Sequence, residues 1–255
     1  MSRTPIVAGN WKMNTLRADA VALAGAIRDR SDAVSSVEKI VCPPFLYLHD
    51  VRAILDGSSI RVGAQNVYWE EKGAFTGEVS VTQVAGAAEY VIIGHSERRQ
   101  NFGETDETVN RRVKSALAHG LKPIMCVGET LDQRQAGHTA DVLTRQTRGG
   151  LDSVDVTAGF IVAYEPVWAI GTGLAADGAT AEEAVALIRN TVRELAGAVA
   201  GSVRILYGGS VTPDNMAEYM AQPDIDGGLV GGASLKADTF AGIIDATAAA
   251  VAGRA

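Results

Sequence analysis

The chain has 255 residues, a formal net charge of −7, 47% apolar residues and 21% charged residues. This composition is typical of a soluble globular protein, and the acidic balance argues against a nucleic-acid backbone as partner, because such binding needs a basic surface. The longest apolar stretches have only strand length, and residues 1–4 run straight into one of them. We therefore expect no membrane span, no signal peptide and a cytoplasmic location.

Short apolar runs rich in β-branched residues recur along the whole chain, and a segment with helical spacing follows each of them. We expect the runs to be strands at residues 6–8, 39–42, 60–63, 90–93, 123–127, 160–163, 203–207 and 228–230. Their apolarity is nearly continuous rather than alternating, which is typical of strands covered on both faces in parallel sheets.

The segments between these runs carry signals for amphipathic helices. One apolar stripe is formed by Leu16, Ala20, Leu23, Ala24 and Ile27, and another by Val109, Val113, Ala116 and Leu117. Residues 180–183 have the spacing of a capping box, and Thr212 before Pro213 has the pattern of a helix start.

Eight such strand and helix units without a break in composition predict one closed (β/α)8 barrel that forms a single domain over residues 1–255. The alternative is a doubly wound open sheet. Such a sheet would need a Gly-x-Gly-x-x-Gly turn after its first strand to bind a dinucleotide, and the chain has Gly9-Asn10-Trp11-Lys12 at that place.

In a barrel, the residues at the carboxyl ends of all strands meet at one mouth. The polar residues and glycine turns at the expected strand ends are Asn10, Lys12, His95, Glu97, Glu165, Gly208-Gly209-Ser210 and Gly231-Gly232. They include a base, an imidazole, a cation and two glycine-rich turns, which are the groups that a proton-transfer enzyme needs.

Glu165 ends an apolar run and is followed at once by Pro166 and a glycine-bearing segment to residue 173. Burial at the tip of a strand disfavours ionisation, so we expect the pKa of Glu165 to be raised toward the range of a general base. The segment after Pro166 is predicted to close over it as a lid. An isolated glutamate at such a place is more often only a solvated strand cap.

Lys12 and His95 each have a structural alternative. Lys12 fits a surface lysine or a Schiff-base nucleophile as well as a cation at an active site. His95 lies between a strand end and a polar segment that begins a helix, where the helix dipole would keep its imidazole neutral, although a lone histidine is more often structural.

The glycine turns after the last two strands fit phosphate binding through backbone N–H groups, and they fit plain tight turns equally well. Cys42 and Cys126 lie within apolar runs, without the spacing of a metal or redox motif. We expect both to be buried, inert thiols, and we expect no metal site.

Five segments, in order along the whole chain, resemble the motifs of the triosephosphate isomerase family. They are residues 9–14, 94–99, 163–173, 207–211 and 228–234. The resemblance implies the TIM-barrel fold and, in glycolysis and gluconeogenesis, the interconversion of dihydroxyacetone phosphate and glyceraldehyde 3-phosphate through an enediolate, with no cofactor.

The resemblance also assigns roles to individual residues. Glu165 shuttles the proton, and His95 polarises the carbonyl group. Lys12 and Asn10 stabilise the developing oxyanion, and Glu97 supports Lys12.

Further residues follow as ligands of the substrate phosphate. The resemblance assigns this binding to backbone N–H groups of Gly171, Ser210 and Gly232, within turns that include Gly231. Gly171 reaches the phosphate only when the lid is shut.

The segment of residues 65–78 is long and irregular, and it carries Tyr68, Trp69 and Phe75. Loops of this length in compact domains are usually functional, and these aromatic groups would be wet in a monomer. The resemblance implies a homodimer in which this loop enters the neighbouring subunit and Thr76 approaches the Asn10 and Lys12 region there. The alternative is an Ω-loop packed on itself.

Two other functions remain open from the residues alone. A Schiff-base aldolase would use Lys12 as its nucleophile. A non-catalytic phosphate-binding barrel would keep the glycine turns but would not need Glu165 and His95.

Overall fold

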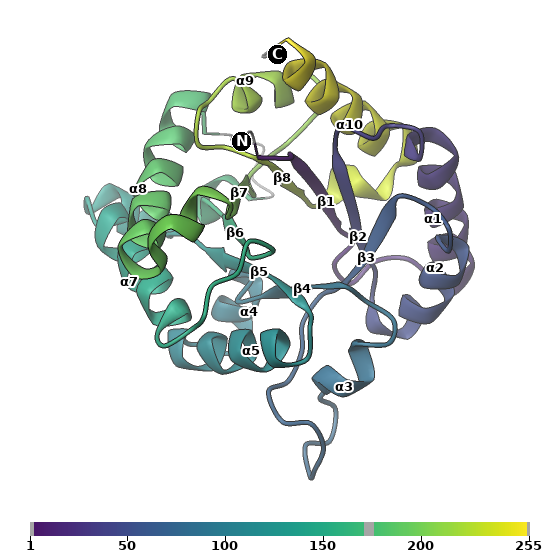
Figure 1. Cartoon of the computed structure of the whole chain (residues 1–255), viewed down its shortest axis with the longest axis horizontal. Helices are drawn as coiled ribbons and strands as arrows, with labels where there is room; N and C mark the ends of the chain where they lie inside the picture. Colours follow the sequence, from purple (N-terminus) through teal and green to yellow (C-terminus); the bar gives the residue numbers. More distant parts are fainter. Residues whose placement is uncertain (1–2, 171–175, 254–255) are drawn as a thin grey trace.

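The computed structural model describes residues 3–170 and 176–253. Eight parallel strands form a closed barrel in which each strand pairs with the next and β8 pairs with β1 (Figure 1). The strands are β1 (Ile6–Asn10), β2 (Glu38–Cys42), β3 (Ile60–Ala64), β4 (Tyr90–Ile93), β5 (Lys122–Val127), β6 (Ile161–Tyr164), β7 (Arg204–Tyr207) and β8 (Gly227–Val230). The predicted (β/α)8 barrel is confirmed, and each expected strand lies within two residues of its observed bounds.

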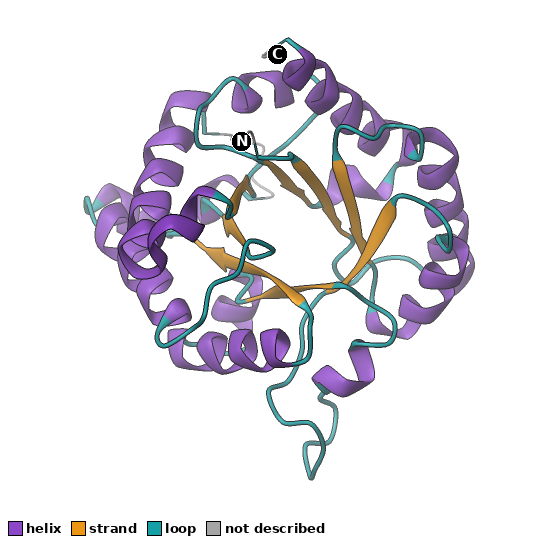
Figure 2. Cartoon of the chain, in the orientation of Figure 1, coloured by secondary structure: helices purple, strands orange, loops and turns teal. Residues whose placement is uncertain are grey.

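Helices surround the barrel on its outside (Figure 2). The α-helices are α1 (Arg17–Ser31), α2 (Leu48–Ile54), α3 (Val81–Val84), α4 (Ser96–Asn101), α5 (Asp106–Ala118), α6 (Leu131–Gln135), α7 (Thr139–Leu151), α8 (Gly178–Ala196), α9 (Met216–Met220) and α10 (Ala237–Ala252). Four short 3-10 helices are η1 (Phe45–Tyr47), η2 (Val167–Ala169), η3 (Gly197–Gly201) and η4 (Gly232–Leu235). Among the described helices, none is long and apolar enough to span a membrane.

The core has two layers, because alternate strand residues point to opposite faces of the sheet. Ile6 and Ala8 belong to a buried cluster inside the barrel, whereas Val7 belongs to the larger cluster between strands and helices. Both layers are apolar, which explains the nearly continuous apolarity of the strands. Cys42 and Cys126 are buried as expected, and burial raises the pKa of the Cys42 thiol to about 12.

Three helix signals differ from the expectation. Helix α9 begins at Met216 with Asn215 as its N-cap, and not at the expected start of Thr212 and Pro213. Helix α8 begins at Gly178, and its N-cap is Asp177, whose carboxylate accepts the Thr180 N–H at 2.8 Å. The expected capping box at residues 180–183 is therefore wrong, because an aspartate earlier in the chain provides the cap. Leu16 is also not part of the buried stripe of α1: it is the N-cap residue and is 71% exposed.

The loop of residues 65–78 projects away from the barrel between β3 and α3 (Figure 1). Its aromatic side chains pack on one another, with ring centroids of Tyr68 and Trp69 4.1 Å apart and those of Tyr68 and Phe75 4.8 Å apart. The guanidinium of Arg112 covers the Trp69 ring at 4.8 Å. Residues 70–78 are nevertheless exposed, so the loop is anchored at its base and free at its tip.

Candidate active site

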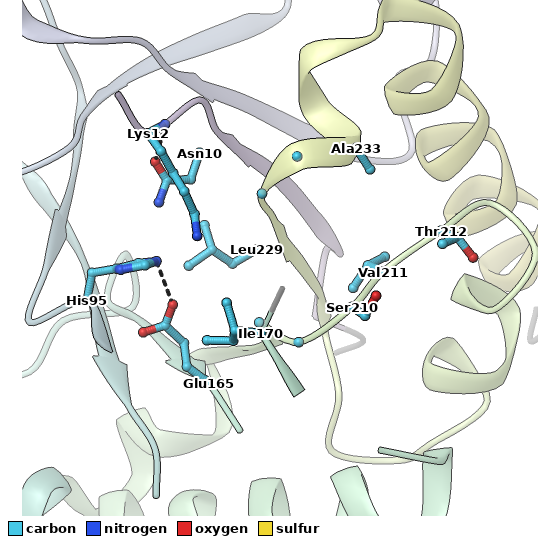
Figure 3. Close-up of a pocket in the computed structure, with 14 residues that line it drawn as sticks. Asn10, Lys12, His95, Glu165, Ile170, Ser210, Val211, Thr212, Leu229 and Ala233 are labelled. Carbon is cyan, nitrogen blue, oxygen red and sulfur yellow. Dashed lines mark hydrogen bonds and ion pairs between the residues drawn. The ribbon is translucent and has the colours of Figure 1, made fainter. Parts of the chain in front are cut away.

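A cavity of about 280 Å³ opens at the carboxyl ends of the strands (Figure 3). Its lining residues are Asn10, Lys12, His95, Glu165, Ile170, Gly208, Gly209, Ser210, Val211, Thr212, Leu229, Gly231, Gly232 and Ala233. The fold thus brings together nine residues that the sequence singled out: Asn10, Lys12, His95, Glu165, Gly208, Gly209, Ser210, Gly231 and Gly232. Glu97 does not line the cavity but contacts Lys12, and Gly171 lies outside the described residues.

Glu165 follows the last residue of β6 and is only 2% exposed. Its Oε1 lies 2.8 Å from Nε2 of His95, and its Oε2 accepts a hydrogen bond of 2.8 Å from the N–H of Ser96. A Cβ atom at Gly208 would lie 3.0 Å from the Glu165 Cγ, which is too close for comfortable packing. The absence of a side chain at Gly208 therefore provides space for the Glu165 side chain. The carboxylate is therefore buried but fully hydrogen-bonded.

These contacts correct the expected direction of the Glu165 pKa. Burial does raise it, but the His95 imidazole and the Ser96 N–H together outweigh burial, and the pKa lies below the ordinary value. The prediction of a raised pKa was wrong because it considered the strand end without the neighbours from β4 and α4. In this arrangement, the carboxylate is ionised and able to accept a proton.

His95 is the N-cap residue of α4, and its Nδ1 accepts the N–H of Glu97 at 3.2 Å. An Nδ1 that accepts a hydrogen bond carries no proton, so the proton of the imidazole is on Nε2, which faces Glu165. Burial lowers the pKa of His95, but contact with the Glu165 carboxylate raises it, and the net direction is upward. This rise depends on Glu165 and is lost when that side chain turns away.

Lys12 has a left-handed backbone conformation with φ of +53°, which is uncommon for a residue other than glycine. The surrounding chain holds this geometry: the Asn10 side chain accepts the Lys12 N–H at 3.0 Å, and the Gln65 amide donates to the Lys12 carbonyl at 2.9 Å. The ammonium group is 2.5 Å from the Glu97 carboxylate. Strain of this kind is retained where it places a functional side chain.

The glycine turns after β7 and β8 form the opposite wall of the cavity from His95 (Figure 3). The turn after β7 is fixed by Asn215, whose amide donates to the Ser210 carbonyl at 3.0 Å and whose carbonyl oxygen accepts the Thr212 N–H at 2.8 Å. A Cβ atom at Gly232 would meet nothing within 4 Å, so the backbone there is open to a ligand. Gly232 also begins the short helix η4.

Several residues of the site were not identified in the sequence. Leu229, Ile170 and Val211 supply apolar lining, and Ser96 supplies the N–H that holds Glu165. Leu229 and Val211 lie beside expected strand ends and glycine turns. This position in the sequence could have identified them as lining residues of the site. The role of the Gln65 amide depends on a contact with a segment 53 residues away and has no local signal.

No group of three or more histidine, cysteine, aspartate or glutamate residues in the described part of the chain has the geometry to hold a metal ion. The fold and the mouth define a class: a (β/α)8 barrel enzyme with a carboxylate and an imidazole in contact beside two glycine turns.

Comparison with known proteins identifies the family within this class. The family model described as triosephosphate isomerase matches residues 5–247. The chain is 54% identical over 246 residues to a triosephosphate isomerase of Citrifermentans bemidjiense and 52% identical over 246 residues to that of Moorella thermoacetica, covering in each case 95% of this chain and 98% of the relative. It is 53% identical over 249 residues to that of Caldanaerobacter subterraneus, covering 95% and 99%. The chain belongs to the triosephosphate isomerase family.

Proposed function

We propose that the protein interconverts dihydroxyacetone phosphate and glyceraldehyde 3-phosphate by proton transfer through an enediolate. The observation that carries this proposal is the contact of 2.8 Å between a buried carboxylate and an imidazole inside a small cavity that ends in two glycine turns. Membership of the family supplies the substrate. The site then supplies a role for each side chain.

Glu165 is the base. Its carboxylate turns from the Ser96 N–H toward the substrate, removes the proton from one carbon and returns it to the neighbouring carbon. The free site favours the ionised carboxylate, so no proton has to leave before the reaction begins. The room beside Gly208 allows this movement without displacing the backbone.

His95 is the electrophile. With its Nδ1 held by the Glu97 N–H, its Nε2–H donates to the substrate oxygen, where negative charge develops. Once Glu165 has turned to the carbon atom, the contact that raised the pKa of His95 is gone. The neutral imidazole can then move a proton between the two oxygens of the enediolate.

Lys12 and Asn10 stabilise the charge on the same oxygens. The Lys12 side chain extends across the mouth toward the space between His95 and Leu229 (Figure 3). Glu97 holds the ammonium group before the substrate enters. The ion pair fits a Lys12 that acts through its charge, and it gives no support to an aldolase in which Lys12 forms a Schiff base.

The phosphate is bound by the turns after β7 and β8. Backbone N–H groups of Ser210 and Gly232, in turns that include Gly231, bind it without a cationic patch, as is common in barrels. Gly171 adds its N–H when the segment after β6 closes. A purely binding barrel would not need the contact between Glu165 and His95, so that alternative is disfavoured.

We infer further that the working form is a homodimer in the cytoplasm. Large apolar side chains are exposed in the segments that follow β1, β2, β3 and β4: Met13 is 97% exposed, Leu46 84%, Phe75 40% and Phe102 68%. A monomer would leave this surface wet. In the dimer, the loop tip with Thr76 supports Asn10 and Lys12 of the partner subunit.

The dimer is tested by deleting residues 73–77. The expected product is a monomer that keeps the barrel and loses activity by about 10²-fold, because small misplacements of catalytic groups are costly. Analytical ultracentrifugation with a parallel activity assay measures both properties. A fully active monomer would contradict the dimer requirement.

The activity itself is tested by a coupled assay of glyceraldehyde 3-phosphate isomerisation on the purified protein, in the presence of a chelator and without added cofactor. We expect rapid conversion. The Glu165→Gln variant, purified in the same way, is the control for contaminating enzyme. Absence of conversion by the wild-type protein would contradict the proposal.

A further inference from the structure

Glu165 separates two cavities. The first is the cavity at the mouth, and the second, of about 170 Å³, lies behind the carboxylate between the ends of β4, β5 and β6 and the helices outside them. We call the second one the rear cavity; its lining includes Ser96, Gln100, Val127 and Thr130. In the described part of the chain, Glu165 is the one residue that lines both cavities.

The two carboxylate oxygens of Glu165 have partners from different cavities. Oε1 contacts His95, which lines the mouth, and Oε2 accepts the N–H of Ser96, which lines the rear cavity. One side of the base therefore faces the place where the substrate binds. The other side faces a space that the proposed reaction does not use.

The rear cavity suits water. Its wall carries hydroxyl, amide and guanidinium groups, including Thr130, Gln146 and Arg99. A cavity of this size holds about five water molecules at ~30 Å³ each, and polar cavities of such size are hydrated. Gln100 on its wall is exposed, so the space reaches the surface of the protein.

The movement of Glu165 also leaves the N–H group of Ser96 in need of another hydrogen-bond acceptor. When the carboxylate turns toward the substrate, the N–H of Ser96 loses its acceptor, and Ser96 is only 6% exposed. An unpaired buried donor is costly, so an acceptor has to take its place. A water molecule in the rear cavity would be beside both residues, because Ser96 and Glu165 line it.

We propose that the rear cavity is a water site through which Glu165 exchanges its proton with solvent while the reaction intermediate is bound. The inference rests on the proposed function, because it concerns the same base. The substrate occupies the mouth at that moment and covers the Oε1 side. Of the two cavities that Glu165 lines in the described part of the chain, the rear one is then left open to solvent.

The chemical balance is simple. The C2–H bond of glyceraldehyde 3-phosphate breaks, its proton binds the Glu165 carboxylate, and the electron pair remains in the enediolate. In D2O, the new O–H group becomes O–D and releases HOD. The deuteron then leaves the carboxyl group and forms the new C1–D bond, whereas a proton that has not exchanged forms a C1–H bond.

The test measures the ratio of deuterium to transferred protium at C1 of dihydroxyacetone phosphate, by NMR, after turnover of glyceraldehyde 3-phosphate in D2O. Two variants obstruct the rear cavity at independent positions. Val127→Ile adds a methyl group to its inner wall and keeps a β-branched strand residue. Gln100→Trp covers its outer end from an exposed position. The matched control is Val62→Ile, at an equally buried position in β3 that does not line the cavity.

We expect the deuterium-to-protium ratio to fall several-fold in both rear-cavity variants, while kcat/KM stays close to that of the wild type and Val62→Ile behaves as the wild type. An unchanged ratio in the variants that fold, or an equal fall in Val62→Ile, would overturn the inference. Gln100→Trp decides the matter if Val127→Ile does not fold. Absence of isomerisation by the wild-type protein would instead contradict the proposed function.

Discussion

Each end of the barrel holds a buried carboxylate bound to a basic side chain, and the two differ in how they are surrounded. At the amino-terminal end, Asp226 precedes β8 and is 5% exposed. Its Oδ1 accepts a hydrogen bond from Arg3, and its Oδ2 accepts 2.7 Å from Arg189 and 2.9 Å from the N–H of Ile205. Two of these donors, Arg189 and Ile205, are themselves buried.

At the carboxyl end, Glu165 is as deeply buried and also has two partners, but cavities lie on both of its sides. Its side chain therefore has somewhere to move, whereas Asp226 lines neither of these two cavities. Burial and pairing alone therefore do not make a carboxylate functional. Space for substrate and for a second position of the side chain distinguishes the base from the structural group.

The largest expected effect comes from Glu165→Gln. The amide keeps the size of the side chain but cannot accept the proton, so kcat should fall by about 10²–10⁴. The melting temperature and the binding of a phosphorylated inhibitor should change little. Steady-state kinetics with calorimetry measure both, and a near wild-type kcat would remove Glu165 from its proposed role.

The matching change at the other end is Arg189→Met. It leaves Asp226 and the carbonyl of Asp224 without their buried partner, which should cost about 3–5 kcal/mol in the free energy of unfolding. Urea unfolding measures this loss. The kcat of the folded fraction should be that of the wild type, and an unchanged stability would show that the cluster is not structural.

Lys12→Met sharpens the assignment of the cation. Removing a charge that stabilises a developing oxyanion should lower kcat by about 10²–10³. Borohydride treatment of the wild-type protein with substrate, followed by mass spectrometry, should give no adduct. A stoichiometric adduct on Lys12 would favour the aldolase instead.

The smallest expected effect is on stability against pH. The pKa of Glu165 is lowered in the folded protein, so its ionisation stabilises the fold above the ordinary value of 4.5, and this contribution is lost as the pH falls through the folded pKa. The stability of the wild type relative to Glu165→Gln should therefore decrease from pH 5 toward the acid side. Urea unfolding of both proteins across this range checks it, and a constant difference would contradict the lowered pKa.

The barrel was predictable because its signal is local and repeated. Runs such as residues 90–93 and 123–127 are apolar on both faces. Such runs indicate strands that are buried on both faces, as in a parallel sheet covered by helices. The mouth residues were predictable for the same reason, since they follow directly after those runs. Even Lys12, whose backbone is strained, was recognised from its position after β1.

What the sequence did not predict depends on contacts between distant segments. The lowered pKa of Glu165 arises from His95 and from Ser96, which is 69 residues away. The rear cavity is lined by residues of α4, β5, α6, α7 and η2, and the Asp226 cluster includes Arg3, which is 223 residues away in the sequence. The predicted start of α8 was wrong for a local reason, because Asp177 and not Thr180 is the N-cap residue of this helix.

The most direct test of the account is a crossed measurement of kcat and melting temperature for Glu165→Gln and Arg189→Met, prepared in parallel with the wild type. We expect Glu165→Gln to lose kcat and keep its melting temperature, whereas Arg189→Met should keep kcat and melt about 10 °C lower. If both variants lost both properties to a similar extent, the division between a catalytic and a structural end of the barrel would be contradicted.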